Sequence, residues 1–145
     1  DILVKISRGN IHNARMLSFQ SIEDIMNTIE KLTTTVIGKD PQKWRNFTSH
    51  YSRVFNANQL DFDRQLNLII IWLQGANRLR QNLVSGFERT GLHSRMISFN
   101  EKFPNANIYK IILCIEEVKS LARQNLYMPL ILLNMLLDIQ ELIYE

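Results

Sequence analysis

Side chains that could hold a metal or a cofactor are few and widely spaced in this chain. His12, His50 and His93 are far apart, and none has a His, Asp or Glu three or four residues away. A metal site on a helix needs such spacing, because residues three or four apart share one face. The single cysteine, Cys114, excludes an internal disulfide and a multi-cysteine zinc site. We expect neither a metal nor a cofactor in this chain.

Nucleophilic and acid–base groups also lack the arrangement that catalysis needs. Cys114 stands in a strongly apolar helical stretch, and we interpret it as a small buried hydrophobic residue with no base to activate it. Glu116 and Glu117 are adjacent, so they point in different directions on a helix. Asp61 and Asp63 flank a predicted helix start, where negative charge is stabilised. The sequence contains no glycine-rich phosphate loop. We therefore predict that the chain is not an enzyme by itself.

Composition narrows the class of protein further. The chain has 145 residues, of which 46% are hydrophobic and 21% charged, with a net charge of +3. A chain of this length can bury a sizeable core, and its composition is too apolar for a disordered protein. No apolar run reaches the roughly 18 residues of a membrane span, and no secretory signal is visible. We expect a cytoplasmic protein, and the Asp at position 1 leads us to expect a piece of a longer one.

The elements that must position these residues are helices, because apolar residues recur at helical spacing along nearly the whole chain. The first clear stretch runs from Ile22 to Val36 and is stopped by Gly38. Asp40 and Pro41 form a helix start, with Asp as the N-cap and Pro in the first turn. No stretch alternates with the period of two that strands need. We predict an all-α packed bundle of about five helices, preceded by a short helical remnant.

The remaining elements follow from the same periodicity. A long central helix is predicted from Leu60 into the 80s, after a break at residues 56–58, and Gly75 within it indicates close helix packing or a bend. A loop over residues 90–94, around Gly91, precedes a short helix over 94–102 and a turn over 103–107. A periodic helix is predicted over 108–121, and a last helix from Met128 to the end. The apolar stripe of that last helix is predicted at Leu130, Leu133, Leu136, Leu137 and Leu142.

Several stretches of this pattern resemble a known family. The run from Ile6 to Leu17, with Gly9 at a helix end, resembles the end of the lid subdomain in AAA+ clamp-loader subunits. The stretches 103–118 and 121–133 resemble the last two helices of bacterial DNA polymerase III δ′ subunits. The aliphatic run that ends at Trp72 and Leu73 resembles the central helix of that family. The family's Asn-x-Asn-Pro turn is altered here, because the proline is displaced to Pro129.

The resemblance implies a division of the chain and a role. Residues 1–20 would be the end of an AAA+ lid subdomain, and residues 21–145 a helical collar domain through which clamp-loader subunits assemble. His12 stands where ATP-hydrolysing subunits carry an arginine, which implies a subunit that does not hydrolyse ATP. The implied partners are the γ/τ and δ subunits of DNA polymerase III, with nucleic acid contacted only indirectly.

Three functional hypotheses follow from these observations. The first is the collar domain, whose subunit-interface candidates are Tyr109, Tyr127, Leu130 and Tyr144. The second is a free-standing α-helical adaptor with a hydrophobic groove for a partner helix. The third is a weak nucleic-acid binder that uses Arg78, Arg80, Arg89 and Arg95. Because the basic residues are otherwise scattered, we interpret these four as part of a solvated surface.

Overall fold

A computed structural model describes residues 22–124 and 126–144 of the chain, and it confirms the predicted all-α bundle. Six helices pack together, and the described residues contain no strand. The helical remnant predicted before residue 21 lies outside the described residues. The elements are α3 (Ile22–Ile37), α4 (Pro41–Ala57), α5 (Gln59–Arg80), α6 (Gly91–Lys102), α7 (Ile108–Leu121), the short 3-10 helix η1 (Ala122–Gln124) and α8 (Met128–Tyr144).

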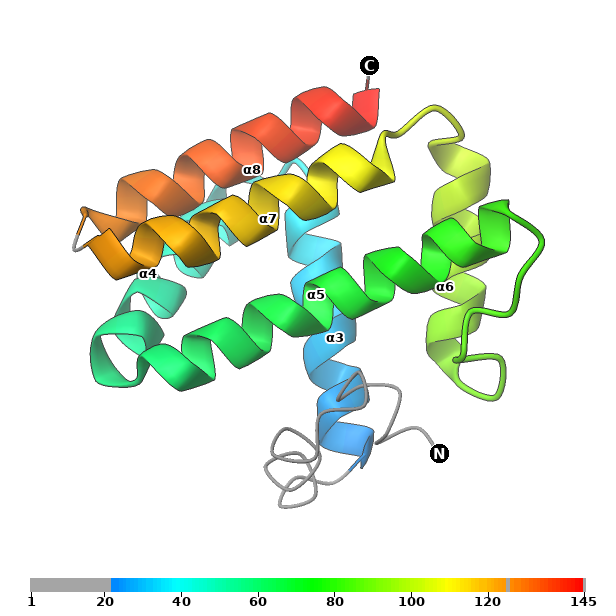
Figure 1. The fold of residues 1–145 in the computed structure, drawn as a ribbon, viewed down its shortest axis with the longest axis horizontal. Coiled ribbons are helices and arrows are strands. Elements are labelled where there is room, and N and C mark those ends of the chain that lie inside the picture. The colour runs from blue at the N-terminus through cyan, green and yellow to red at the C-terminus, as the bar shows by residue number, and fades with distance from the viewer. Residues whose placement is uncertain (1–21, 125, 145) are drawn as a thin grey trace.

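Helix α5 is the centre of the bundle, as its broad apolar face predicts. It contacts α3, α4, α6 and α7, and Figure 1 shows it running beneath the neighbouring pair α7 and α8. All six of the residues that periodicity assigned to its inner face are buried: Leu66, Ile69, Ile70, Trp72, Leu73 and Ala76. The core therefore surrounds the middle of α5, and the other helices are positioned against it.

Two of the predicted helix boundaries are set by side-chain caps. Asp40 Oδ1 accepts a hydrogen bond from the backbone N–H of Gln42 at 2.9 Å, which confirms the predicted start of α4. The predicted break at residues 56–58 contracts to Asn58 alone. Its backbone N–H donates to the carbonyl of Val54, and its side chain accepts from the N–H of Asp61. One asparagine thus ends α4 and begins α5.

The loop predicted around Gly91 is wrong, because helix α6 begins at this glycine. Thr90 Oγ1 accepts from the N–H of Leu92 at 3.3 Å and caps the helix. The actual connection spans residues 81–90, where Asn82 and Gly86 adopt positive φ angles of 60° and 93°. Glycine is frequent in loops, but the preceding Thr90 is a strong helix-start residue, and its side chain caps α6.

The predicted inner face of α8 is also partly wrong. Leu136 is buried and Leu142 half-buried as expected, but Leu130, Leu133 and Leu137 are exposed. The buried face is formed by Met128, Leu132, Met135, Leu136, Ile139, Gln140 and Ile143. Because apolar residues occur on nearly every side of α8, their spacing alone does not select the face that packs on the core.

Gly75 marks a close contact between α5 and α6, which is one of the two explanations predicted for it. A Cβ atom added at this position would lie 2.8 Å from Met96 Cε and 3.1 Å from Met96 Sδ. Met96 is fully buried. The missing side chain of Gly75 therefore leaves the space that the end of Met96 occupies.

Arg80, in the last turn of α5, ties three segments together. Its guanidinium donates through Nε to Asn100 Oδ1 at 2.8 Å, through Nη1 to the carbonyl of Ala106 at 2.6 Å, and through Nη2 to the carbonyl of Phe103 at 2.6 Å. Asn100 in turn donates to the carbonyl of Ala76 at 2.9 Å. Arg80 therefore holds the end of α6 and the turn before α7 against the end of α5.

The C-terminal end of α3 is capped by side chains from two other helices. Gln140 Nε2 on α8 lies 3.2, 2.8 and 3.1 Å from the carbonyl oxygens of Val36, Ile37 and Gly38. Trp44 Nε1 on α4 donates to the carbonyls of Thr35 and Gly38, at 3.2 and 3.0 Å. These donors satisfy carbonyls that a helix end leaves unpaired, and they fix α3 against α4 and α8.

Candidate protein-interaction surfaces

The four predicted interface residues are all exposed, but the structure places them at two ends of the α7–α8 pair. Their exposed fractions are 69% for Tyr109, 73% for Tyr127, 54% for Leu130 and 52% for Tyr144. Leu130 and Tyr144 are fourteen residues apart on one helix, which corresponds to about 21 Å along its axis. The N–H of Asn107 donates to the carbonyl of Leu142, so Tyr109 lies near the C-terminal end of α8. The four residues do not form one patch.

An exposed row of leucines on α8 forms a more continuous surface. Leu130, Leu133 and Leu137 are exposed by 54%, 39% and 48%. Their spacing of three and four residues puts them on one face of the helix. We call these three residues the α8 stripe. Leu126 and Tyr127, which directly precede the helix, are also exposed and extend the apolar character towards its start.

Tyr144, in contrast, is engaged within the chain. Its ring meets that of Phe103 edge-on, with centroids 5.2 Å apart, and Lys39 Nζ lies 3.7 Å from its centroid. These contacts place Tyr144 at the side of a groove. It is therefore less free for a subunit contact than its exposed fraction alone suggests.

This groove, which we call the α3–α6 groove, has a volume of about 700 Å³. Residues from α3, α6 and the end of α8 line it, together with Trp72 from α5. Its aromatic residues form a row, because Trp72 packs on Phe99 at 5.4 Å, Phe99 on Phe103 at 5.5 Å, and Phe103 on Tyr144. The sequence did not reveal the groove, because its lining comes from four separate helices.

The arginine cluster proposed for nucleic acid is largely engaged in contacts within the chain. Arg80 makes the three hydrogen bonds described above. Arg78 Nε donates to the carbonyl of Val84 at 2.9 Å, and Arg95 Nη2 lies 2.5 Å from Glu30 Oε1. Arg89 is exposed. The cluster therefore does not form the free basic stripe that nucleic-acid binding requires.

The side chains singled out for possible metal or acid–base chemistry also remain dispersed. No group of three or more His, Cys, Asp or Glu side chains suited to a metal ion occurs in the described part of the chain. His50 is exposed and packs edge-on against Tyr51, His93 Nδ1 lies 3.4 Å from Ser85 Oγ, and His12 lies outside the described residues.

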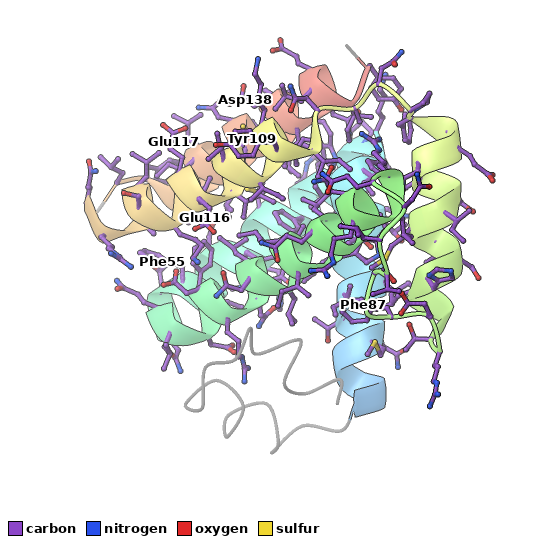
Figure 2. All side chains as sticks on the ribbon, turned by 45° about the vertical axis from the view of Figure 1, so that its right-hand side comes forward. Phe55, Phe87, Tyr109, Glu116, Glu117 and Asp138 are labelled. Carbon is purple, nitrogen blue, oxygen red and sulfur yellow. The ribbon has the colours of Figure 1, made fainter. Side chains whose placement is uncertain are left out.

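Cys114 is half-buried on α7 and is not the fully buried residue that the sequence predicted. Burial raises the pKa of its thiol, and the negative charges of Asp138 and Glu117 raise it further. Figure 2 labels both carboxylates, on α8 and α7 respectively. An activated thiol needs a lowered pKa, so this environment suppresses the reactivity of the only cysteine.

Among the helices described here, none is both long enough and apolar enough to cross a bilayer. Comparison of the chain with protein-family models, with curated proteins and with solved structures finds no match.

Proposed function

We propose that this chain is an assembly module that joins neighbouring subunits through the α8 stripe. The observation that carries the proposal is the row of Leu130, Leu133 and Leu137 on a helix whose opposite face is anchored in the core. Exposed apolar residues grouped on one rigid face are typical of protein–protein contacts. The resemblance to δ′ subunits suggests the identity of the assembly: a clamp loader of DNA replication, acting in the cytoplasm.

The α8 stripe can contribute only part of the association energy. Complete burial of a leucine side chain stabilises a complex by about 1.5–3 kcal/mol relative to full exposure. Because each of the three is about half exposed, covering them contributes about 3 kcal/mol in total. A stable interface needs more than this, so the partner must also contact residues around the stripe.

In the proposed role, residues 21–145 form the collar domain, and the γ/τ and δ subunits are the neighbours. The chain would hold its subunit in the ring, and it would affect DNA only through that ring. This division follows from the resemblance of residues 6–17 to a lid end and of residues 103–133 to the last collar helices.

The test is co-purification of the full chain with γ/τ and δ subunits. Replacing Leu133 and Leu137 with glutamate puts two charges on the stripe, and we expect it to abolish association. The matched control, Asn105→Glu with Ser120→Glu, adds the same charge at exposed positions in the turn before α7 and on α7, and we expect it to retain association. Wild-type chain that stays monomeric with these subunits at micromolar concentration would contradict the proposal.

A second candidate function, the helical adaptor, is favoured by the α3–α6 groove, since an open groove with an aromatic floor is a recurrent way to bind a partner segment. Ser98 is an exposed groove residue on α6. Its replacement by tryptophan would fill the groove and leave the α8 stripe unchanged. The adaptor would be favoured over the collar if Ser98→Trp abolished association with the co-purified subunits and the Leu133→Glu, Leu137→Glu variant retained it.

A further inference from the structure

We propose that the α3–α6 groove binds an acidic segment of a partner protein, one that also carries leucine or phenylalanine side chains. The proposal does not depend on the clamp-loader assignment, because the groove and the α8 stripe share no residue. It rests on the charge of the groove walls, on the apolar floor and on the shape of the groove.

The walls of the groove are basic. Lys39, Arg95 and Lys102 line it, and no carboxylate occurs among its described lining residues. Arg95 and Lys102 are seven residues apart on α6, so they lie on the same side of that helix, two turns apart. Arg95 is paired with Glu30, which lies outside the lining. The groove therefore offers a positive potential to an occupant.

Neither Lys39 nor Lys102 forms an ion pair with a carboxylate in the described part of the chain. Aromatic rings hold both side chains in place instead. Lys39 Nζ lies 3.7 Å from the ring centroid of Tyr144, and Lys102 Nζ lies 5.4 Å from that of Phe103. An aromatic face attracts an ammonium group but does not neutralise it. Both charges therefore remain available for ion pairs with an acidic segment, while their positions are restrained.

The floor of the groove is apolar. Trp72, Phe99 and Phe103 form a continuous aromatic row beneath the basic walls. The exposed hydroxyl-bearing residues Ser94 and Ser98 add hydrogen-bond donors along one wall.

This combination favours an acidic peptide over a nucleic acid. A nucleic-acid site needs cations spaced along a phosphate track, whereas here two lysines that are unpaired among the described residues, together with Arg95 in its pair with Glu30, line an apolar floor. A volume of about 700 Å³ is enough for a few side chains and lies in the range of ordinary ligand sites. The groove is open to solvent and is not an enclosed cavity, which suits a segment of a longer chain better than a small molecule.

The test uses the full chain and a short fluorescein-labelled peptide of Asp, Glu, Leu and Phe, followed by fluorescence anisotropy. The comparison probes are the same peptide with Asn and Gln in place of the acids, and a labelled single-stranded oligothymidylate. The charge-reversal variant is Lys39→Glu with Lys102→Glu. Its matched control is Lys110→Glu with Arg123→Glu, which makes the same change in charge at exposed positions on α7 and η1.

We expect the acidic peptide to bind the wild-type chain, and the charge reversal to weaken it about tenfold. The control should change the affinity less than about twofold. Ser98→Trp, which changes no charge, should also prevent binding by filling the groove. Far-ultraviolet circular dichroism of each variant verifies that the helices remain folded, so loss of binding in a folded variant reports on the groove.

Each of the other outcomes overturns the proposal. Absence of binding at millimolar peptide shows that the groove does not recognise such a segment. Equal binding of the Asn/Gln peptide shows that charge is not the determinant. Equal sensitivity of peptide binding to the groove reversal and to the control places the site elsewhere. Tighter binding of the oligothymidylate, weakened by the groove reversal, identifies a nucleic-acid site instead.

Discussion

Arg80 is the position where a single substitution tests the packing of the bundle most directly. Arg80→Ala removes the donors that reach Asn100, Ala106 and Phe103 at 2.8, 2.6 and 2.6 Å. Two of the three acceptors are backbone carbonyls in the turn between α6 and α7. Burial lowers the pKa of Arg80, but an arginine stays charged in a folded protein, so all three hydrogen bonds have a cationic donor.

The expected loss of stability follows from these contacts. A buried hydrogen bond to a charged group contributes about 1.5–3 kcal/mol, and a neutral one about 1 kcal/mol. Arg80 is only half-buried, so water replaces part of each contact, and we take about 1 kcal/mol for each. The total of about 3 kcal/mol is a large fraction of the 5–15 kcal/mol that stabilises a typical domain. Arg80→Lys keeps one donor group and should lose about 2 kcal/mol.

Urea unfolding followed by circular dichroism at 222 nm measures this loss. Arg89→Ala is the matched control, because Arg89 is an exposed arginine nine residues further along the chain. It should change the free energy of unfolding by less than about 0.5 kcal/mol. Equal and small effects of the two alanine substitutions would refute the reasoning, and would show that solvent satisfies the three acceptors as well as Arg80 does.

Three further predictions concern other contacts. Gly75→Ala should be neutral or destabilising in the wild-type chain, because the added Cβ would meet the terminal methyl group of Met96. In a Met96→Leu background, where that methyl group is gone, Gly75→Ala should stabilise the chain by about 1 kcal/mol. Equal changes in the free energy of urea unfolding in both backgrounds would contradict the contact. Gln140→Leu should cost about 2 kcal/mol and should increase amide exchange at the end of α3, since the carbonyls of Val36 and Ile37 lose their side-chain donor and that of Gly38 keeps only Trp44. Because the pKa of the Cys114 thiol is raised, iodoacetamide at pH 8 should alkylate the folded chain more slowly than the urea-unfolded chain. Asp138→Asn should increase the alkylation rate of the folded chain about twofold. An unchanged rate in this variant would exclude the Asp138 carboxylate as a cause of the raised pKa. The pKa of the Cys114 thiol is higher in the folded chain than in the unfolded one. The contribution of this thiol to stability is therefore complete below its unfolded pKa and decreases as the pH rises above that value.

Local signals in the sequence were sufficient for most of the fold. Asp40 and Pro41 start α4 as predicted, and α7 begins where the predicted turn over 103–107 ends, with Asn107 as its cap. The inner face of α5 was predicted correctly because its apolar residues concentrate at the middle of the helix. The side of α8 that faces the core was not, since leucines occur all around that helix and tertiary packing decides which are covered. The loop predicted around Gly91 was wrong because Thr90, directly before the glycine, caps the start of α6.

The features that define the candidate surfaces depend on distant contacts, which spacing along the chain does not reveal. Arg80 belonged to a basic cluster in the sequence, but its partners are 20 to 26 residues away. The α3–α6 groove exists only because α3, α5, α6 and α8 meet. Tyr109, Tyr127, Leu130 and Tyr144 are the predicted subunit-interface candidates. All four are exposed, yet only Leu130 belongs to the continuous α8 stripe. The resemblance to δ′ subunits remains a prediction that the subunit experiment will test.

The cap on the end of α3 has a consequence for how the chain is made. Gln140 and the carbonyl of Ile37 that it binds are 103 residues apart. During synthesis from the N-terminus, α3 and α4 leave the ribosome long before the glutamine exists, and Trp44 is the only one of the two capping side chains yet present. The last turn of α3 is completed only when α8 arrives and docks. Contacts of such sequence separation slow folding. We therefore expect the C-terminal carbonyls of α3 in the nascent chain to lack the Gln140 cap until α8 has left the ribosome.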